Sequence, residues 1–405
     1  MTAMPRFIDP AGAQTQAPSG RIPLLAFVAD AASEQAMQLF LADLKMPRDA
    51  VRRGGVAKAM QFLAANRSPA VLIVDISGIE LPVSEVNRLA EACEPNVTVI
   101  AIGERNDVAL YRDLMRAGVT DYIVKPLTRE LIRNSYKNAT GNVEREQISK
   151  KLGKPIVFIG TRGGVGTTTL AVNTAWHLAE KMGRRVALVD LDLQNGDCPL
   201  MLNVKPSSGL REALENPLRI DGVFLDRALS RYGERLFVLG SEEPLVDELR
   251  FKPNAIEHLL TALREQFHYI IIDLPRTPTD LAHRALDLAA ARVVVSDLTM
   301  RSLRDTVRIQ NGFNRQDGSQ PSLLVINRLG ERGRAEIRLK EFIGAVGGDV
   351  SLTVPFRPRE CAAAANSGRP VASKSSALAG AAAQLAAELT GQQPKKRKGW
   401  FSWTR

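Results

Sequence analysis

A glycine-rich turn between a predicted strand and a predicted helix is the part of the sequence best suited to chemistry. Residues 156–160 (IVFIG) form an apolar run, and residues 161–169 (TRGGVGTTT) follow it, directly before helical spacing begins. Gly163, Gly164 and Gly166 let backbone N–H groups turn inward as an anion cradle. The N-terminus of the next helix adds partial positive charge. The pattern predicts a phosphate-binding loop, and the alternative is a tight turn without a ligand.

One position departs from the usual phosphate-binding pattern. Thr167 stands where a P-loop has a lysine after its last glycine, so a full positive charge is missing beside the β- and γ-phosphates. A hydrogen bond to a charged group is worth about 1.5–3 kcal/mol, so we expect weak affinity, slow hydrolysis or both. Thr168 stands where such loops place their Mg²⁺ ligand. Arg162 offers a forked guanidinium for phosphate.

Carboxylates end two other apolar runs. Asp190 and Asp192 close the run 186–192 (VALVDLD), and Asp273 closes the run that begins at Tyr269. In open α/β sheets, ligands bind at the carboxyl ends of the strands. Carboxylates there hold Mg²⁺, directly or through water, or orient a nucleophilic water. The alternative is that they cap the next helix or turn.

These residues must be positioned by strands that alternate with helices, which predicts the α/β class with two doubly wound parallel-sheet domains. We expect a disordered arm at 1–20, a first domain at 21–135, a linker at 136–154, a P-loop domain at 155–390 and a tail at 391–405. The predicted strands are 24–29, 71–75, 97–102, 121–124, 156–159, 186–189, 236–239, 269–272, 292–296, 322–326 and 350–354. The predicted helices are 33–44, 84–92, 108–117, 168–182, 254–265, 281–290, 300–313 and 375–389.

The strings TRGGVGTTT, VDLDLQNGD, IIIDLP and LLVINR, in this order, resemble the MinD/ParA superfamily of deviant Walker ATPases. Within it, the arginine–threonine loop and VDLDLQNGD resemble the CpaE/TadZ proteins of Flp (tad) pilus assembly. The likeness covers about residues 156 to 390, and a receiver-like domain ahead of it is also similar to that subgroup. The resemblance implies that the chain binds ATP with Mg²⁺ and forms a homodimer around the nucleotide.

The resemblance also implies roles for single residues. Arg162 matches the signature lysine that reaches across the dimer to the phosphates on the other subunit. Asp192 matches the carboxylate that positions attacking water, and Asp273 matches the Walker B aspartate beside the Mg²⁺ ligand Thr168. The nucleotide is expected to contact the loop and two later positions: Gly163, Gly164, Val165, Gly166, Thr167, Thr168, Thr169, Asn327 (base recognition) and Pro355 (base pocket). Thr167 matches no family lysine, so hydrolysis is expected to be weak or absent.

The first domain resembles a response-regulator receiver. Asp75 ends a strand where the phosphoacceptor would be, and Lys125, followed by proline, matches the switch lysine. The usual acidic pair is reduced to Asp30, and Gly103 replaces a Ser or Thr hydroxyl. Because Mg²⁺ binding needs carboxylates, the favoured interpretation is a binding module for localisation or dimerisation, with phosphorylation as the alternative.

Composition bounds the partners. The formal net charge of the 405 residues is +10, which favours an anionic partner. About half of the excess lies in a tail that also carries three aromatic rings, a combination typical of an anionic membrane interface, with a merely solubilising tail as the alternative. The basic and aromatic tail residues are Lys395, Lys396, Arg397, Lys398, Trp400, Phe401, Trp403 and Arg405.

Cys93, Cys198 and Cys361 are far apart in the sequence, which argues against a disulfide framework and a zinc site. The first twenty residues lack the apolar stretch of a secretory signal, and no run of about 18 apolar residues is present. We therefore expect a cytoplasmic protein that is peripheral at the inner membrane and located at a cell pole.

Three functions are compatible with these observations, and one of them, a conventional ATPase with fast hydrolysis as in a MinD-like oscillator, is disfavoured by Thr167. The first is a spatial organiser or scaffold for Flp pilus or type II-like secretion assembly, with pilus or secretion components as partners. The alternative is a ParA-like DNA partition ATPase, which the net charge permits. No helix-turn-helix candidate precedes the ATPase sequence, which speaks against DNA as the partner.

Overall fold

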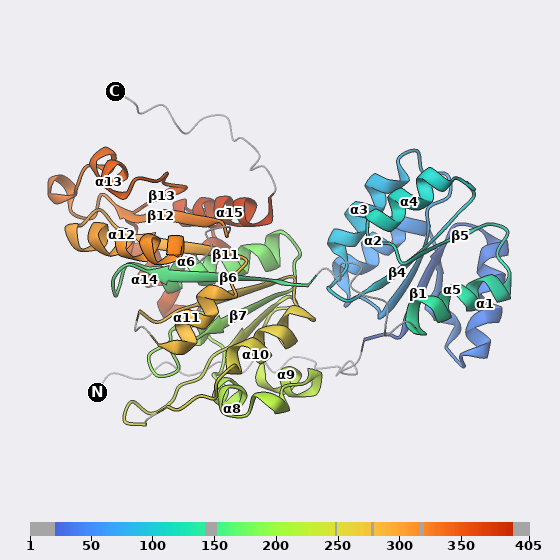
Figure 1. The fold of residues 1–405 in the computed structure, drawn as a ribbon, viewed down its shortest axis with the longest axis horizontal. Helices are drawn as coiled ribbons and strands as arrows, with labels where there is room; N and C mark the ends of the chain where they lie inside the picture. The colour runs from blue at the N-terminus through green and yellow to red at the C-terminus, as the bar shows by residue number, and fades with distance from the viewer. Residues whose placement is uncertain (1–20, 142–151, 248, 277–278, 316–319, 392–405) are drawn as a thin grey trace. The chain divides into compact units, whose positions relative to one another are not determined.

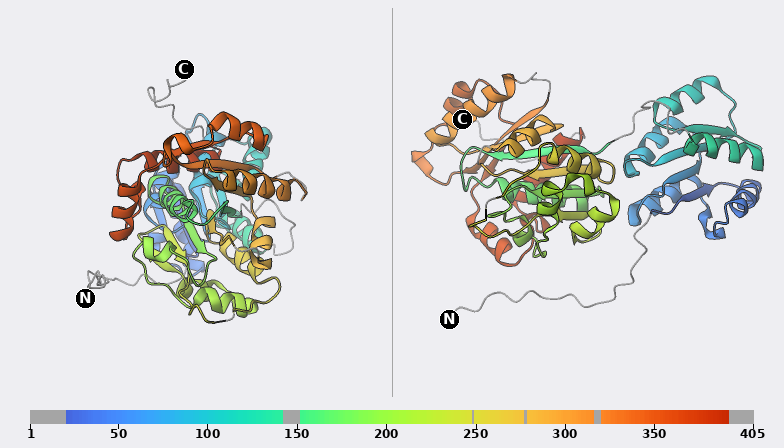
Figure 2. Two further views of the ribbon diagram at one scale, coloured as in Figure 1. Left: turned by 90° about the vertical axis from the view of Figure 1, so that its left-hand side faces the viewer. Right: turned by 60° about the horizontal axis from the view of Figure 1, so that its bottom comes forward.

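A computed structural model describes residues 21–141, 152–247, 249–276, 279–315 and 320–391. The chain divides between Leu152 and Gly153 into two compact units. Each is a parallel-stranded sheet between layers of helices, as Figures 1 and 2 show, so the predicted α/β class is confirmed. The predicted arm, most of the predicted linker and the basic aromatic tail beyond Gly391 lie outside the described residues.

The first unit has a five-stranded sheet in the order β2-β1-β3-β4-β5, with every neighbouring pair parallel. Helices α2, α3 and α4 pack on one face of it, and α1 and α5 on the other. The elements are β1 Leu24–Val28, α1 Ala31–Asp43, β2 Val51–Arg53, α2 Gly55–Ala65, β3 Val71–Asp75, α3 Pro82–Ala92, β4 Thr98–Gly103, α4 Val108–Arg116, β5 Asp121–Val124 and α5 Arg129–Gly141.

The second unit has an eight-stranded sheet in the order β13-β12-β11-β6-β10-β7-β9-β8. All neighbours are parallel except the edge pair β8 and β9. The strands are β6 Lys154–Gly160, β7 Val186–Asp190, β8 Ser230–Tyr232, β9 Leu236–Leu239, β10 Tyr269–Asp273, β11 Ala291–Ser296, β12 Ser322–Leu329 and β13 Leu352–Pro355. The helices are α6 Thr167–Trp176, α7 Cys198–Met201, α8 Gly209–Glu215, α9 Gly222–Ala228, α10 Ala255–Arg264, α11 Asp280–Asp287, α12 Met300–Arg315, α13 Leu339–Val346, α14 Pro358–Asn366 and α15 Ala377–Thr390.

The strands of the second unit are apolar on both faces because each face has its own core. In β6, Ile156 and Phe158 pack into the core under α6 and α15, whereas Val157 packs into the core under α8 to α13. In β10, Ile271 and Ile272 divide between the two cores in the same way. Such doubly covered strands are expected of parallel sheets.

Helix α6 is shorter than the sequence predicts. The pattern predicts one helix over 168–182, but regular α-helix ends at Trp176 and a π-helical turn, His177–Lys181, follows. Several elements were not predicted at all, because they are short or lack a clear apolar period. They are β2, α2, α5, α7, α8, α9, β8, α13 and α14.

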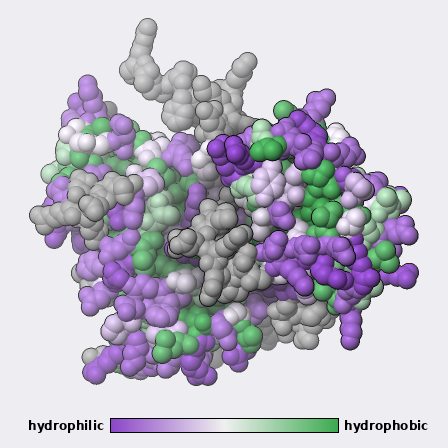
Figure 3. Space-filling model, turned by 45° about the vertical axis from the view of Figure 1, so that its right-hand side comes forward, coloured by the Kyte–Doolittle hydropathy of each residue, from purple (hydrophilic) through white to green (hydrophobic). Residues whose placement is uncertain are grey.

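No helix among the described residues is long and apolar enough to cross a membrane. On the face drawn in Figure 3, hydrophobic residues lie in small groups within a mainly hydrophilic surface.

Candidate nucleotide-binding site

The glycine-rich loop connects the end of β6 to the start of α6, as the sequence predicts. Gly166 is the residue before the helix and has φ +97°, and Gly164 has φ +75°, both in the region that favours glycine. A Cβ on Gly166 would lie 2.3 Å from Nδ2 of Asn327, whereas a Cβ on Gly163 would meet nothing within 4 Å. The loop therefore needs glycine at 166 and has open space beside 163, where a ligand fits.

Asn327 holds this loop from a neighbouring strand. Its Nδ2 donates a hydrogen bond to the Val165 carbonyl at 2.8 Å, and the residue is only 8% exposed. The pairing of β12 with β13 shifts register after Ile326, and Arg328 has φ +59°. Pro355 ends β13 beside this irregular stretch. The family resemblance implies base recognition for Asn327, and in the structure this residue lies against the glycine-rich loop.

The acidic strand ends meet at the same edge of the sheet. Asp190 and Asp273 are register partners on β7 and β10, and β10 also neighbours β6. The Thr168 side chain, in the first turn of α6, lies close enough to Asp273 to oppose the rise in the pKa of that carboxyl. Asp273 is 5% exposed, and its Oδ1 has no hydrogen-bond partner. A buried orphan carboxylate oxygen beside a threonine hydroxyl suits Mg²⁺, which prefers oxygen ligands.

Asp192 lies just beyond the end of β7, in the turn that leads to α7. Its Oδ1 accepts a hydrogen bond from the Asn195 N–H at 3.0 Å, and its own N–H donates to Oδ1 of Asp190 at 3.2 Å. The side chain is partly exposed, unlike Asp190 and Asp273, which are buried. Asp192 is therefore the strand-end carboxylate open to water.

The second unit, which contains this site, is similar to known proteins. Residues 153–317 match the AAA domain family. The second unit contains this match and is called the AAA domain below, after the family that it resembles. The septum site-determining protein MinD of Bacillus subtilis (strain 168) is 28% identical over 180 residues, which are 44% of this chain and 66% of that protein, just under two thirds of its length.

Two solved structures complete the comparison. One is a ParA family ATPase from Chlorobium tepidum TLS, and its match spans 59% of the present chain and 99% of the ATPase chain. The TM-score is 0.53 and the sequence identity is 19%, so the match shows the fold alone. A pilus assembly protein CpaE from Caulobacter crescentus CB15 is 32% identical over 29% of this chain and 97% of that chain, with a TM-score of 0.26.

The buried carboxylates Asp190 and Asp273 of the AAA domain have no positively charged side chain paired with them among the described residues. Burial raises the pKa of Asp190, and burial followed by the charge of Asp190 raises the pKa of Asp273. Within the described part of the chain, neither carboxylate forms an ion pair. Buried carboxylates without a cation favour a proton or a bound metal ion.

Arg162 of the AAA domain points back onto its own chain. Its Nε lies 2.8 Å from Oδ2 of Asp297, its Nη2 contacts the same oxygen, and its Nη1 donates to the Gly163 carbonyl at 3.0 Å. Glu331 lies 4.0 Å away. The Arg162 side chain is only 15% exposed. To reach a second subunit, Arg162 must first leave Asp297.

The first unit brings Asp30, Asp75 and Lys125 together. Lys125 Nζ lies 2.6 Å from Oδ2 of Asp30 and 2.8 Å from Oδ2 of Asp75. Both oxygens of Asp75 also accept backbone N–H groups, at 2.9 and 3.0 Å. The Lys125 hydrogen bond lowers the pKa of Asp30 to about 2. The three side chains form one ion network, in which Lys125 is paired with both carboxylates.

Gly103 has a structural explanation. A Cβ at this position would lie 2.3 Å from the Tyr122 hydroxyl, which donates a hydrogen bond to the Arg105 carbonyl at 2.9 Å. The tyrosine therefore occupies the space that a Ser or Thr side chain would need. The absence of the expected hydroxyl at 103 and the presence of Tyr122 are one adaptation.

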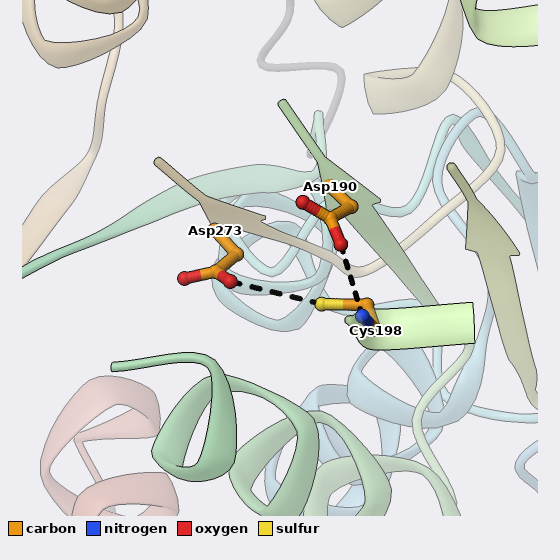
Figure 4. Close-up of side chains that lie close together, drawn as sticks. All are labelled: Asp190, Cys198 and Asp273. Carbon is orange, nitrogen blue, oxygen red and sulfur yellow. Dashed lines mark hydrogen bonds between the residues drawn. The ribbon is translucent and has the colours of Figure 1, made fainter. Parts of the chain in front are cut away.

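Sequence reasoning assigned no role to Asp297, Glu331 or Cys198. Asp297 and Glu331 follow strands of the AAA domain but belong to no string that resembles a motif. Cys198 begins α7 and is completely buried between Asp190 and Asp273 (Figure 4). Its position directly after VDLDLQNGD was the one available signal.

Proposed function

We propose that the AAA domain binds ATP with Mg²⁺ and that the chain forms a nucleotide-dependent homodimer with weak or absent hydrolysis. The observation that carries the proposal is the meeting of the glycine loop, Thr168 and Asp273 at one sheet edge. Thr168 and Asp273 would hold Mg²⁺, which when bound neutralises phosphate charge. Asn327 and Pro355 would line the base side, and Asp192 would orient water.

Weak turnover is part of the proposal because Thr167 supplies no ammonium group. Removing that charge weakens stabilisation where it is needed during phosphoryl transfer. The backbone cradle at Gly163, Gly164 and Gly166 does not depend on this side chain, so binding is expected to persist.

Dimerisation is assigned to Arg162. The arginine would exchange its bond with Asp297 for phosphate oxygens on the other subunit, where a guanidinium can make a bidentate contact. We expect light scattering to show a change from monomer to dimer mass when ATP and Mg²⁺ are added to the full chain. Arg162→Ala should stay monomeric, and Arg338→Ala, an exposed arginine on the same unit, should dimerise like the parent chain. Equal dimerisation of Arg162→Ala would overturn this role.

The biological role that we propose is a scaffold for Flp pilus or type II-like secretion assembly. The motif strings that resemble CpaE/TadZ proteins support it. The first unit supports it as well, because Lys125 already pairs with both Asp30 and Asp75, which suits a binding module better than a phosphoacceptor. The alternative, DNA partition, draws on the likeness of fold to a ParA family ATPase. ATP-dependent, salt-sensitive DNA binding would favour that alternative, and its absence would favour the scaffold.

Attachment to the inner membrane surface is proposed through residues 391–405. Each basic residue near an anionic leaflet contributes about 1 kcal/mol, and aromatic rings add interfacial affinity. Co-sedimentation with anionic vesicles should be lost in a chain that ends at Gln393. Undiminished binding of that shorter chain would rule the tail out.

A further inference from the structure

A buried group of three metal-ligating side chains lies at the ends of β7 and β10 and at the start of α7. The carboxylates of Asp190 and Asp273 and the thiol of Cys198 each offer one ligand atom, and these atoms all lie within 4.8 Å of one another. Figure 4 shows both carboxylates directed toward Cys198. The Cys198 Sγ lies 3.8 Å from Oδ2 of Asp273, and the Cys198 N–H donates to Oδ2 of Asp190 at 2.9 Å.

The charge of this group is not balanced by the protein. Asp190 is 1% exposed, Asp273 is 5% exposed and Cys198 is completely buried. Within the described ranges, neither carboxylate is in an ion pair, and Oδ1 of Asp273 has no hydrogen-bond partner. A buried polar atom without a partner indicates a proton, a water molecule or an ion that completes the site.

The thiol decides which ion fits. Mg²⁺ takes oxygen ligands, so a thiol adds nothing to a magnesium site. Thiolate together with carboxylate suits Zn²⁺ and other thiophilic divalent cations. Tetrahedral ligands about 2.1–2.3 Å from zinc lie roughly 3.6 Å apart, close to the observed distance between Sγ and Oδ2. Three protein ligands leave a fourth position for water.

We propose that Asp190, Cys198 and Asp273 form a binding site for a thiophilic divalent cation of the Zn²⁺ class. The site shares Asp273 with the proposed magnesium site, but it rests on the buried cluster alone and not on nucleotide binding. The wide spacing of the three cysteines in the sequence argues against a zinc site made of cysteines. Here one cysteine and two strand-end carboxylates converge through the fold.

Cobalt is a suitable probe because a cobalt–thiolate bond absorbs light in the near ultraviolet. The full chain, freed of metal by a chelator and without nucleotide, is titrated with Co²⁺ and then with Zn²⁺. We expect one Co²⁺ per chain with a thiolate-to-cobalt band, which Zn²⁺ abolishes. Cys198→Ser should lose the band, whereas Cys93→Ser and Cys361→Ser, matched controls, should keep it. A band that survives Cys198→Ser, or no cobalt bound at micromolar concentration, would overturn the proposal.

Two further measurements test the site even if the Cys198→Ser variant fails to fold. Asp190→Asn keeps the thiol and should bind Co²⁺ at least tenfold more weakly. X-ray absorption of the zinc-loaded parent chain should show one sulfur ligand among oxygen ligands, and a shell without sulfur would contradict the site. Binding of ATP with Mg²⁺ is measured separately, so that failure of the nucleotide proposal is distinguished from failure of this one.

Discussion

At the scale of single residues, the account depends on what Thr167 lacks. Its hydroxyl packs toward Gly160, since a Cβ there would lie 2.4 Å from Oγ1. No ammonium group therefore comes from this position, and Arg162 is paired with Asp297. Phosphate recognition by the isolated chain would rest mainly on backbone N–H groups and the helix terminus.

Thr167→Lys should restore the missing charge. We expect ATP affinity to rise about tenfold to a hundredfold, because a hydrogen bond to a charged group contributes about 1.5–3 kcal/mol. Turnover should rise as well. Calorimetric titration and phosphate release measure the two effects. Thr167→Met, of similar length but uncharged, is the control, and an equal gain in that variant would show that charge is not the defect.

The lowered pKa of Asp30 predicts that the first unit loses stability at low pH. Its pKa is lowered to about 2, chiefly by the Lys125 hydrogen bond, so its contribution to the free energy of unfolding is fully present above the ordinary aspartate pKa of about 4. That contribution is lost as the pH falls through about 2. Hydrogen exchange of β1 and β3 peptides in urea, at pH 5 and 2.5, measures it. Asp30→Asn should be less pH-dependent, and an identical loss in both chains would refute the assignment.

At the scale of elements, the junction of β6 and α6 sets the site. The loop has two left-handed glycines, and Asn327 from β12 ties it to the sheet. The carboxyl ends of β7 and β10 supply the acids in register. The backbone conformation and the neighbours at each loop position therefore determine which substitutions the loop tolerates.

Gly166→Ala should disrupt the loop and Gly163→Ala should not. Alanine at 166 meets both a φ of +97° and a contact of 2.3 Å with Asn327, and such strain costs about 1–3 kcal/mol. At position 163, φ is not positive and nothing lies within 4 Å of the new Cβ. The free energy of unfolding should therefore change by less than about 0.5 kcal/mol. Urea unfolding without nucleotide checks this, and equal destabilisation would contradict it.

The sequence predicts the strands well and the smaller elements poorly. Long apolar runs such as β10 mark buried strands, and glycines mark the loop. Helix α5 is polar on average and β2 has only three residues, so neither stands out as an apolar run in the sequence. Asp297 comes to Arg162 only through the fold, because nothing in its spacing indicates that neighbour. For Cys198 the sequence offers only its place directly after VDLDLQNGD, which does not indicate its contact with Asp273.

At the scale of the whole molecule, two parallel-sheet units divide the work that we propose. The AAA domain would switch between monomer and dimer with nucleotide, and the first unit would bind partners. Nucleotide can drive such a switch only by as much as it binds the dimer more tightly than the monomer. If that affinity were nil, the chain would be a permanent platform.

The most direct test of the central claim is a calorimetric titration of the full chain with ATP in the presence of Mg²⁺. Saturable binding of one nucleotide per chain, with a Kd below about 1 mM, is the predicted result. No occupancy at millimolar ATP would contradict the account, because backbone amides and a guanidinium would then be unable to replace the missing lysine.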